Sequence, residues 1–188
     1  MIERLGTYRN LVTLRDGTRV LLRVLEKGDK AALQAMFDQV SDEDLKYMHS
    51  NVKNPALIQK WLDEMDYSQI IPVVALVGGK IVGDATLHRG QGSYRHTGEL
   101  RIFLQGAYRQ RGLGTAMLKS LIDVANKLEM HLLTAEVIAE KISVIRAFQA
   151  LGFQLLASLP GYFMMPDGKT LDVALLILPL AKRGLSEF

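Results

Sequence analysis

The sequence of 188 residues contains no cysteine. A disulfide, a thiolate metal site and a covalent acyl-cysteine intermediate are therefore excluded, and any chemistry depends on oxygen and nitrogen groups or on a borrowed cofactor. Long hydrophobic runs are also lacking, because the longest, 70–77 and 173–178, are too short to span a bilayer. The first six residues lack the apolar core of a signal peptide, so we expect a cytoplasmic protein without a membrane partner.

Charge of one sign is in small excess. Lys and Arg number 23 against 20 Asp and Glu, which gives a net charge of +3, and no cluster of five like charges occurs. This balance does not suit a nucleic-acid partner. The four histidines show no paired-ligand spacing, so we predict no metal. With 48% hydrophobic residues, no internal repeat and no long Pro, Gly or Ser linker, residues 1–188 are predicted to form a single domain.

The spacing of apolar residues changes along the chain and predicts a mixed α/β fold. Short strands come first, helical patterns follow, and strands and helices are mixed from residue 70 onward. The expected strands are 11–14, 19–24, 70–77, 80–88, 98–104, 131–137, 153–159 and 171–178. The expected helices run to Phe37, from Ser41 as an N-cap, from Pro55 as a first helical residue, from Gly112, and over 142–151.

The segment 98–115 is the most informative part of the sequence. A strand leads directly into a glycine-containing turn and a helix, so unpaired N–H groups and the positive end of the helix dipole face the space beyond the strand. Gly112 and Gly114 allow an anion to approach the backbone closely, and Arg109 and Arg111 add positive charge. We therefore interpret this segment as a cradle for a phosphate-bearing ligand.

Two common phosphate motifs do not fit the segment. Counting from Gly106, Arg111 stands where a P-loop requires its second glycine, and Met117 stands where a dinucleotide fingerprint requires a small residue. The loop 109–114, Arg-Gln-Arg-Gly-Leu-Gly, instead resembles the [QR]-x-x-G-x-[GA] loop with which GCN5-related N-acetyltransferases bind the pyrophosphate of acetyl-CoA. The segment 147–153 resembles the terminal Y-x-x-x-G-F segment of the same family.

This resemblance implies an α/β fold with a central, mostly antiparallel sheet, splayed at a bulge in the strand before the loop and flanked by helices. Residues 11–65 would supply N-terminal strands and acceptor-side helices, and residues 70–180 the acetyl-CoA-binding core. Oligomeric state is left open, with a homodimer as one alternative. The residues that the resemblance implies for acetyl-CoA are Phe103, Leu104, Gln105, Arg109, Gln110, Arg111, Gly112, Leu113, Gly114 and Thr115.

A second, weaker resemblance concerns the N-terminal half. The segments 14–17, 22–25 and 40–43 resemble the opening of bacterial protein-lysine acetyltransferases. The acceptor that the two resemblances imply is a primary amine, either a small molecule or a protein lysine. Without a cysteine, the acetyl group would pass to it directly.

Glu99 is the predicted general base. An amine with a pKa of about 10.4 must lose a proton before it attacks a thioester, and a partly desolvated carboxylate can accept that proton. Glu99 lies on the predicted strand before the loop and resembles the position of a glutamate base in the protein-acetyltransferase branch. The alternative is that Glu99 forms an ion pair with Arg101 or with an arginine across the sheet.

The sequence departs from the family at the expected general acid. Phe148 stands where the family often has a tyrosine, and a phenylalanine has no proton to give. Ser143 and Tyr162 are alternative donors, and Lys141 replaces a frequent family asparagine. The departure keeps a rival interpretation open, a coenzyme A-binding regulatory module with weak or no transferase activity.

Overall fold

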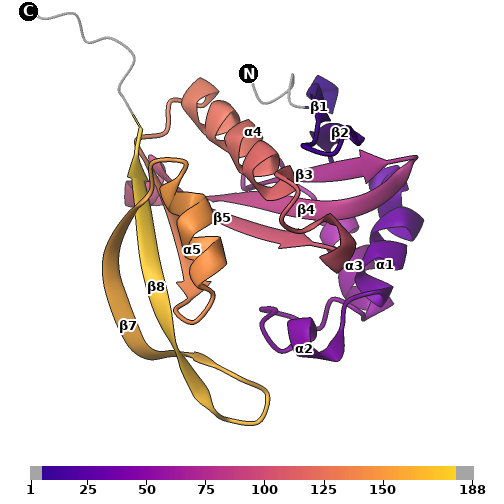
Figure 1. Ribbon diagram of the computed structural model, residues 1–188. Coiled ribbons are helices and arrows are strands. Elements are labelled where there is room, and N and C mark those ends of the chain that lie inside the picture. The colour runs from indigo at the N-terminus through magenta and orange to yellow at the C-terminus, as the bar shows by residue number, and fades with distance from the viewer. Residues whose placement is uncertain (1–5, 181–188) are drawn as a thin grey trace, which may run out of the picture.

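The computed structural model describes residues 6–180, and their strands form one eight-stranded sheet in the order β1-β2-β3-β4-β5-β6-β8-β7 (Figure 1). All neighbours are antiparallel except β5 and β6. The strands are β1 (Arg9–Thr13), β2 (Arg19–Val24), β3 (Ile70–Val77), β4 (Lys80–Arg89), β5 (Thr97–Leu104), β6 (Leu132–Ile138), β7 (Gln154–Met164) and β8 (Thr170–Pro179). The mixed, mostly antiparallel fold class predicted from the sequence is confirmed.

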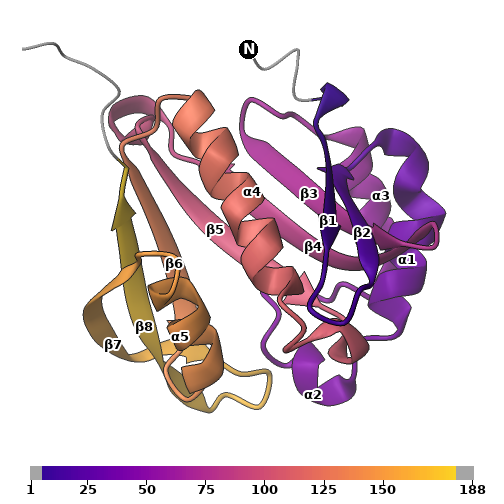
Figure 2. The same cartoon turned by 45° about the horizontal axis from the view of Figure 1, so that its top comes forward.

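Helices cover both faces of this sheet (Figures 1 and 2). They are α1 (Lys30–Asp38), α2 (Asp42–Leu45), α3 (Pro55–Asp63), α4 (Leu113–Lys127) and α5 (Ile142–Gln149). Along α4, Leu113, Met117 and Leu121 recur every fourth residue, which places them on one face where all three are fully buried. They belong to a core with the strands and α5, whereas α1 and α3 enclose a second core on the opposite face.

The helix starts follow from local sequence. The Ser41 hydroxyl accepts a hydrogen bond from the Asp44 amide, and the Asn54 side chain accepts one from the Ala56 amide, so each caps a first turn as expected. Pro55 occupies the first position of α3, where no amide hydrogen is required. No helix within residues 6–180 is long and apolar enough to cross a membrane.

The sheet is splayed between β5 and β6. Their parallel pairing covers only Thr97, Gly98 and Glu99 of β5, and beyond Glu99 the two strands diverge (Figure 2). The antiparallel pairing of β5 with β4 nevertheless keeps one register from Gly98 to Leu104. The splay is therefore confirmed, but the expected bulge is not seen in this pairing, and the early end of the β5–β6 ladder leaves the β5 edge open.

Candidate active site

The glycine loop and the start of α4 form a donor-rich end of the sheet. Gln110 and Gly112 have positive φ angles of 59° and 91°, a backbone geometry in which successive amides can converge on an anion. Within the described chain, no side chain caps α4, so the amides of its first turn point outward without an intrahelical partner. A Cβ on Gly114 would meet Leu104 at 3.4 Å, so this glycine lets α4 begin close against β5.

The open edge of β5 adds further backbone groups. The Gln105 amide donates to the Val82 carbonyl at 3.0 Å on β4. Because amides alternate sides along an antiparallel strand, the Phe103 amide also faces β4, whereas the amides of Leu104 and Ile102 face the open edge. Of the three strand residues expected to bind acetyl-CoA, Leu104 is thus the one whose amide is directed there. Ile102 was missed by sequence reasoning, since its side chain belongs to an apolar pattern.

Both loop arginines are paired with carboxylates from the N-terminal half. The Arg109 guanidinium donates to both Asp44 carboxylate oxygens, at 3.2 and 2.7 Å, and to the Leu104 carbonyl at 3.0 Å. The Arg111 guanidinium is ion-paired with Asp16 and donates to the Thr18 hydroxyl at 3.0 Å. The expected positive charge of the cradle is therefore balanced by two acids that lie far away in sequence.

The same ion pairs affect the acids. The Arg109 hydrogen bonds, opposed by burial, hold the pKa of Asp44 below its ordinary value. For Asp16, the hydrogen bond from the Thr18 amide and those from Arg111 lower the pKa to about 2. Both carboxylates are ionised at neutral pH, and each can hold its arginine in position.

Glu99 lies on a polar face of the sheet with Arg101, His88 and Thr86. The Arg101 guanidinium donates to the Glu99 carboxylate at 2.7 and 3.0 Å, which is the ion pair that the sequence left as an alternative. His88 is opposite Glu99 in the β4–β5 register, and its Nε2 lies 2.9 Å from the Thr86 hydroxyl. Glu99 therefore belongs to a polar network, and as a base it would accept a proton while it is paired with Arg101.

Burial and neighbouring charge set the protonation of this network. Burial raises the pKa of Glu99, but hydrogen bonds and charge from Arg101, together with His88 and His49, bring it below its ordinary value. Burial, reinforced by the Arg101 charge, lowers the pKa of His88 to about 4. On the same face, burial raises the pKa of Asp84 to about 7. Glu99 is thus an ionised acceptor at neutral pH and His88 is neutral.

The position of the expected tyrosine acid is part of the core. Phe148 is 2% exposed and packs edge-on against Phe153, with ring centroids 5.1 Å apart. Of the alternative donors, Ser143 is exposed on α5, whereas Tyr162 lines a pocket. Lys141, just before α5, places its ammonium 4.1 Å from the ring centroid of Tyr47 after α2. This contact joins the two sides of the splay.

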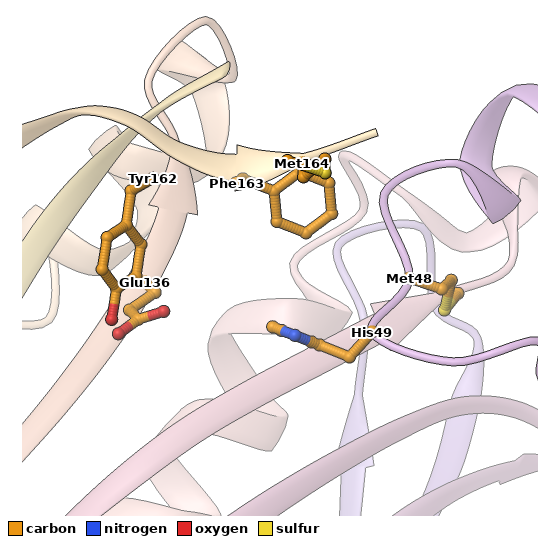
Figure 3. A pocket seen from close by; sticks show the side chains of 6 residues that line it. All are labelled: Met48, His49, Glu136, Tyr162, Phe163 and Met164. Atoms are coloured by element: carbon orange, nitrogen blue, oxygen red, sulfur yellow. The ribbon is translucent and has the colours of Figure 1, made fainter. Parts of the chain in front are cut away.

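A pocket of about 440 Å³ lies between the loop 46–54 and the strands β6 and β7 (Figure 3). In Figure 3, Tyr162 and Glu136 occupy one side, Met48 and His49 the opposite side, and Phe163 lies between them. The His49 and Phe163 rings are edge-on at 6.1 Å. His49 is also close enough to Glu99 to affect its pKa, so the pocket adjoins the polar network. Sequence reasoning missed the pocket because three separate segments build it. That the protein binds no metal stays a prediction.

The mixed sheet, its splay and the glycine loop are the features that the resemblance to N-acetyltransferases implied. The model of the acetyltransferase (GNAT) family matches residues 32–153, and the chain belongs to this family. The resemblance identified from the sequence is therefore confirmed.

Three similar proteins illustrate the relationship. L-methionine sulfoximine/L-methionine sulfone acetyltransferase of Salmonella typhimurium (strain LT2) is 23% identical over 161 residues, which cover 85% of this chain and 94% of the relative. The structure of an acetyltransferase of the GNAT family from Streptococcus pneumoniae has a TM-score of 0.74 and 25% identity, and covers 86% of this chain and 99% of its own. The structure of an acetyltransferase from Salmonella typhimurium with its cofactor acetyl-CoA has a TM-score of 0.73 and 21% identity. The match covers 89% of this chain and 98% of that one.

Proposed function

We propose that the protein transfers an acetyl group from acetyl-CoA directly to a primary amine. The observation that carries this proposal is the adjacency of two donor sets, the uncapped first turn of α4 and the outward amides of the β5 edge, in a chain of the acetyltransferase family. The first set suits a pyrophosphate, and the second suits the amide-bearing arm of coenzyme A. The relative that is 23% identical is named as an L-methionine sulfoximine/L-methionine sulfone acetyltransferase, and this name favours a small-molecule acceptor.

The residues present fit acetyl-CoA in this position. The first-turn amides of Leu113, Gly114 and Thr115 are the donors for its phosphates, and the Leu104 and Ile102 amides are the donors along the open strand edge. Gly114 keeps the helix start free of a side chain between these two sets. When bound, acetyl-CoA supplies the acetyl group, which exchanges its C–S bond for a C–N bond to the acceptor; coenzyme A leaves as a thiolate and takes up the second proton that the amine loses.

Glu99 takes the proton of the acceptor ammonium in this proposal. The lowered pKa keeps Glu99 ionised at neutral pH, so its carboxylate is free to accept a proton, and desolvation in the site favours the neutral amine over the ammonium. Arg101 fixes the Glu99 carboxylate by two hydrogen bonds. The Leu104 amide can stabilise negative charge that develops on a carbonyl oxygen at the open edge.

Binding and turnover test this function separately. Calorimetric titration with acetyl-CoA should show saturable binding, and acetyl-CoA should raise the melting temperature. Release of coenzyme A thiol should then depend on both the protein and an added primary amine. Absence of heat and of a thermal shift at saturating acetyl-CoA would contradict the proposal.

One observation favours a second function, a coenzyme A-binding module without turnover. Phe148 is buried in the core, so the tyrosine acid usual in the family is absent from that position. A coenzyme A thiol ionises with a pKa near 8.5, and the leaving thiolate can therefore depart without a tyrosine, which is why transfer remains the main proposal. Acetyl-CoA binding without thiol release across an amine panel would support the module.

A cytoplasmic location and a homodimer, both expected from the sequence as possibilities, stay predictions.

A further inference from the structure

The pocket beside Glu99 carries an inference about the acceptor, and this inference rests on the proposed function. We infer that the acceptor is a primary amine with an apolar body and a second cationic group, and that Glu136 binds this second group. The inferred class is that of aliphatic and aromatic diamines. Three features support it: the chemistry of the walls, the charge of the pocket, and the position of Glu136 relative to Glu99.

The walls of the pocket suit an apolar body. Met48, Phe163 and Met164 contribute thioether and aromatic surface, and Tyr162 adds a second ring (Figure 3). A volume of about 440 Å³ lies in the range of small-molecule sites. Methionines adapt to ligands of different shapes, and aromatic rings attract cations to their faces. The walls therefore favour a slender amine over a strongly polar substrate.

The charge of the pocket selects against acids. Among the described residues that line it, Glu136 is the carboxylate, and neither Lys nor Arg contributes. The ion pairs formed within residues 6–180 do not include Glu136, so its charge is available to a ligand. An acceptor carboxylate at this position would meet like charge, whereas an ammonium would form a charge-assisted hydrogen bond. The pocket thus discriminates by the sign of the second group.

The position of Glu136 fits two amines in one ligand. Thr134 of β6 pairs with Glu99, and Glu136 follows two residues later on the same face, because Ala135 and Val137 face the core. Two residues of a strand span about 7 Å, and the divergence of β5 and β6 beyond Glu99 adds to the separation of the two carboxylates, so a flexible chain of several carbons is needed to join them. His49 lines the pocket and its charge also acts on Glu99, so the pocket lies near both carboxylates. A diamine can therefore present one amine to Glu99 and the other to Glu136.

The test compares two amines of equal length, 1,5-diaminopentane and n-pentylamine, with 6-aminohexanoate as an acid. For the wild-type protein, kcat/KM from thiol release should be at least tenfold higher for the diamine than for pentylamine, and 6-aminohexanoate should be the poorest. In Glu136→Gln the ratio of diamine to pentylamine should fall at least tenfold. Glu140→Gln removes the same charge from an exposed residue outside the pocket and should keep the wild-type ratio.

Calorimetric binding separates failure of this inference from failure of the proposed function. With coenzyme A present, the diamine should bind the wild-type protein at least tenfold more tightly than pentylamine, and Glu136→Gln should lose this difference. Equal binding of both amines, or an unchanged ratio in Glu136→Gln, overturns the inference whatever the turnover. Selective diamine binding without thiol release supports the inference and contradicts only the transferase.

Discussion

The two halves of the site are built in opposite ways. The proposed acetyl-CoA side comes from one continuous segment, 98–115, in which strand, loop and helix follow each other directly. The acceptor side is assembled from β4, β5, the loop 46–54, β6 and β7, which meet through the sheet and its splay. Backbone amides are the main expected donors on the first side, whereas charged side chains are the main expected contacts on the second. From this difference we expect that binding of acetyl-CoA and choice of acceptor can be changed independently, and variants on each side test that separation.

Removal of the Glu99 charge should give the largest effect and should be confined to the acceptor side. We expect Glu99→Gln to lower kcat/KM for an amine at least 100-fold, because loss of a general base typically costs about 10²–10⁴-fold. Its affinity for acetyl-CoA in calorimetry should stay within twofold of the wild type, and Glu140→Gln should retain activity. A loss of acetyl-CoA affinity equal to the loss of activity would break the separation of the two sides.

His88 and Asp84, on the polar face of the sheet that carries Glu99, should make stability depend on pH in opposite directions. The folded-state pKa of His88 is depressed to about 4, so the unfolded chain binds more protons below pH 6.5 and His88 favours unfolding as the pH falls. The folded-state pKa of Asp84 is raised to about 7, so the folded chain binds more protons between pH 7 and 4 and Asp84 favours folding as the pH falls. Between pH 7 and 5 each contribution amounts to about 2 kcal/mol, with opposite signs.

Variants separate these two contributions. Urea unfolding at pH 7 and pH 5 should show that His88→Gln becomes more stable relative to wild type at pH 5, by about 2 kcal/mol. Asp84→Asn should become less stable relative to wild type over the same interval, by a similar amount. If both variants follow the wild-type pH profile, the assignment of these protonation states is wrong.

On the acetyl-CoA side, Gly112 tests the role of the backbone. Its φ of 91° is unfavourable for a residue with a Cβ, and we expect Gly112→Ala to destabilise the fold by about 1–2 kcal/mol. If the loop moves to relieve this strain, its amides leave the geometry that suits an anion, and we expect acetyl-CoA affinity to fall about tenfold, at 1.4 kcal/mol per factor of ten. Gly106→Ala is the matched control, because its Cβ would meet nothing within 4 Å. Equal acetyl-CoA affinities for the two variants would contradict a backbone cradle.

The smallest effect concerns the ion pair between Arg109 of the glycine loop and Asp44 of α2. Asp44 competes for the Arg109 guanidinium, so Asp44→Asn should free this charge and strengthen acetyl-CoA binding about threefold at low salt, while stability changes by less than about 1 kcal/mol. Glu43→Gln, which removes a neighbouring charge on α2, should have no effect. Weaker acetyl-CoA binding by Asp44→Asn would show instead that the ion pair organises the cradle.

Local signals explain how much of the fold was predictable. Ser41 and Asn54 cap helices because short polar side chains compete for first-turn amides, and Gly112 begins α4 because only a glycine adopts its φ cheaply. The Glu99–Arg101 pair was foreseeable as an alternative, since residues two apart in a strand share a face. All these relations act over a few residues, which is the range that sequence patterns report.

The remaining features depend on distant segments. The Arg109–Asp44 contact joins residues 65 positions apart, and the pocket combines the loop 46–54 with β6 and β7. Neither follows from local periodicity, because the register of the sheet and the end of the β5–β6 ladder decide which side chains meet. The expected bulge is not seen in the β5–β4 pairing, whose register stays regular; early termination of the neighbouring ladder opens the edge instead.

The most direct test of the central claim is mass analysis of an amine acceptor after incubation with acetyl-CoA and the protein. We expect that one acetyl group is added per acceptor molecule, in equal amount to the thiol released, and that Glu99→Gln forms this product at least 100-fold more slowly although it still binds acetyl-CoA. Saturable acetyl-CoA binding without acetylated amine from any acceptor tested would contradict the transferase and leave a coenzyme A-binding module.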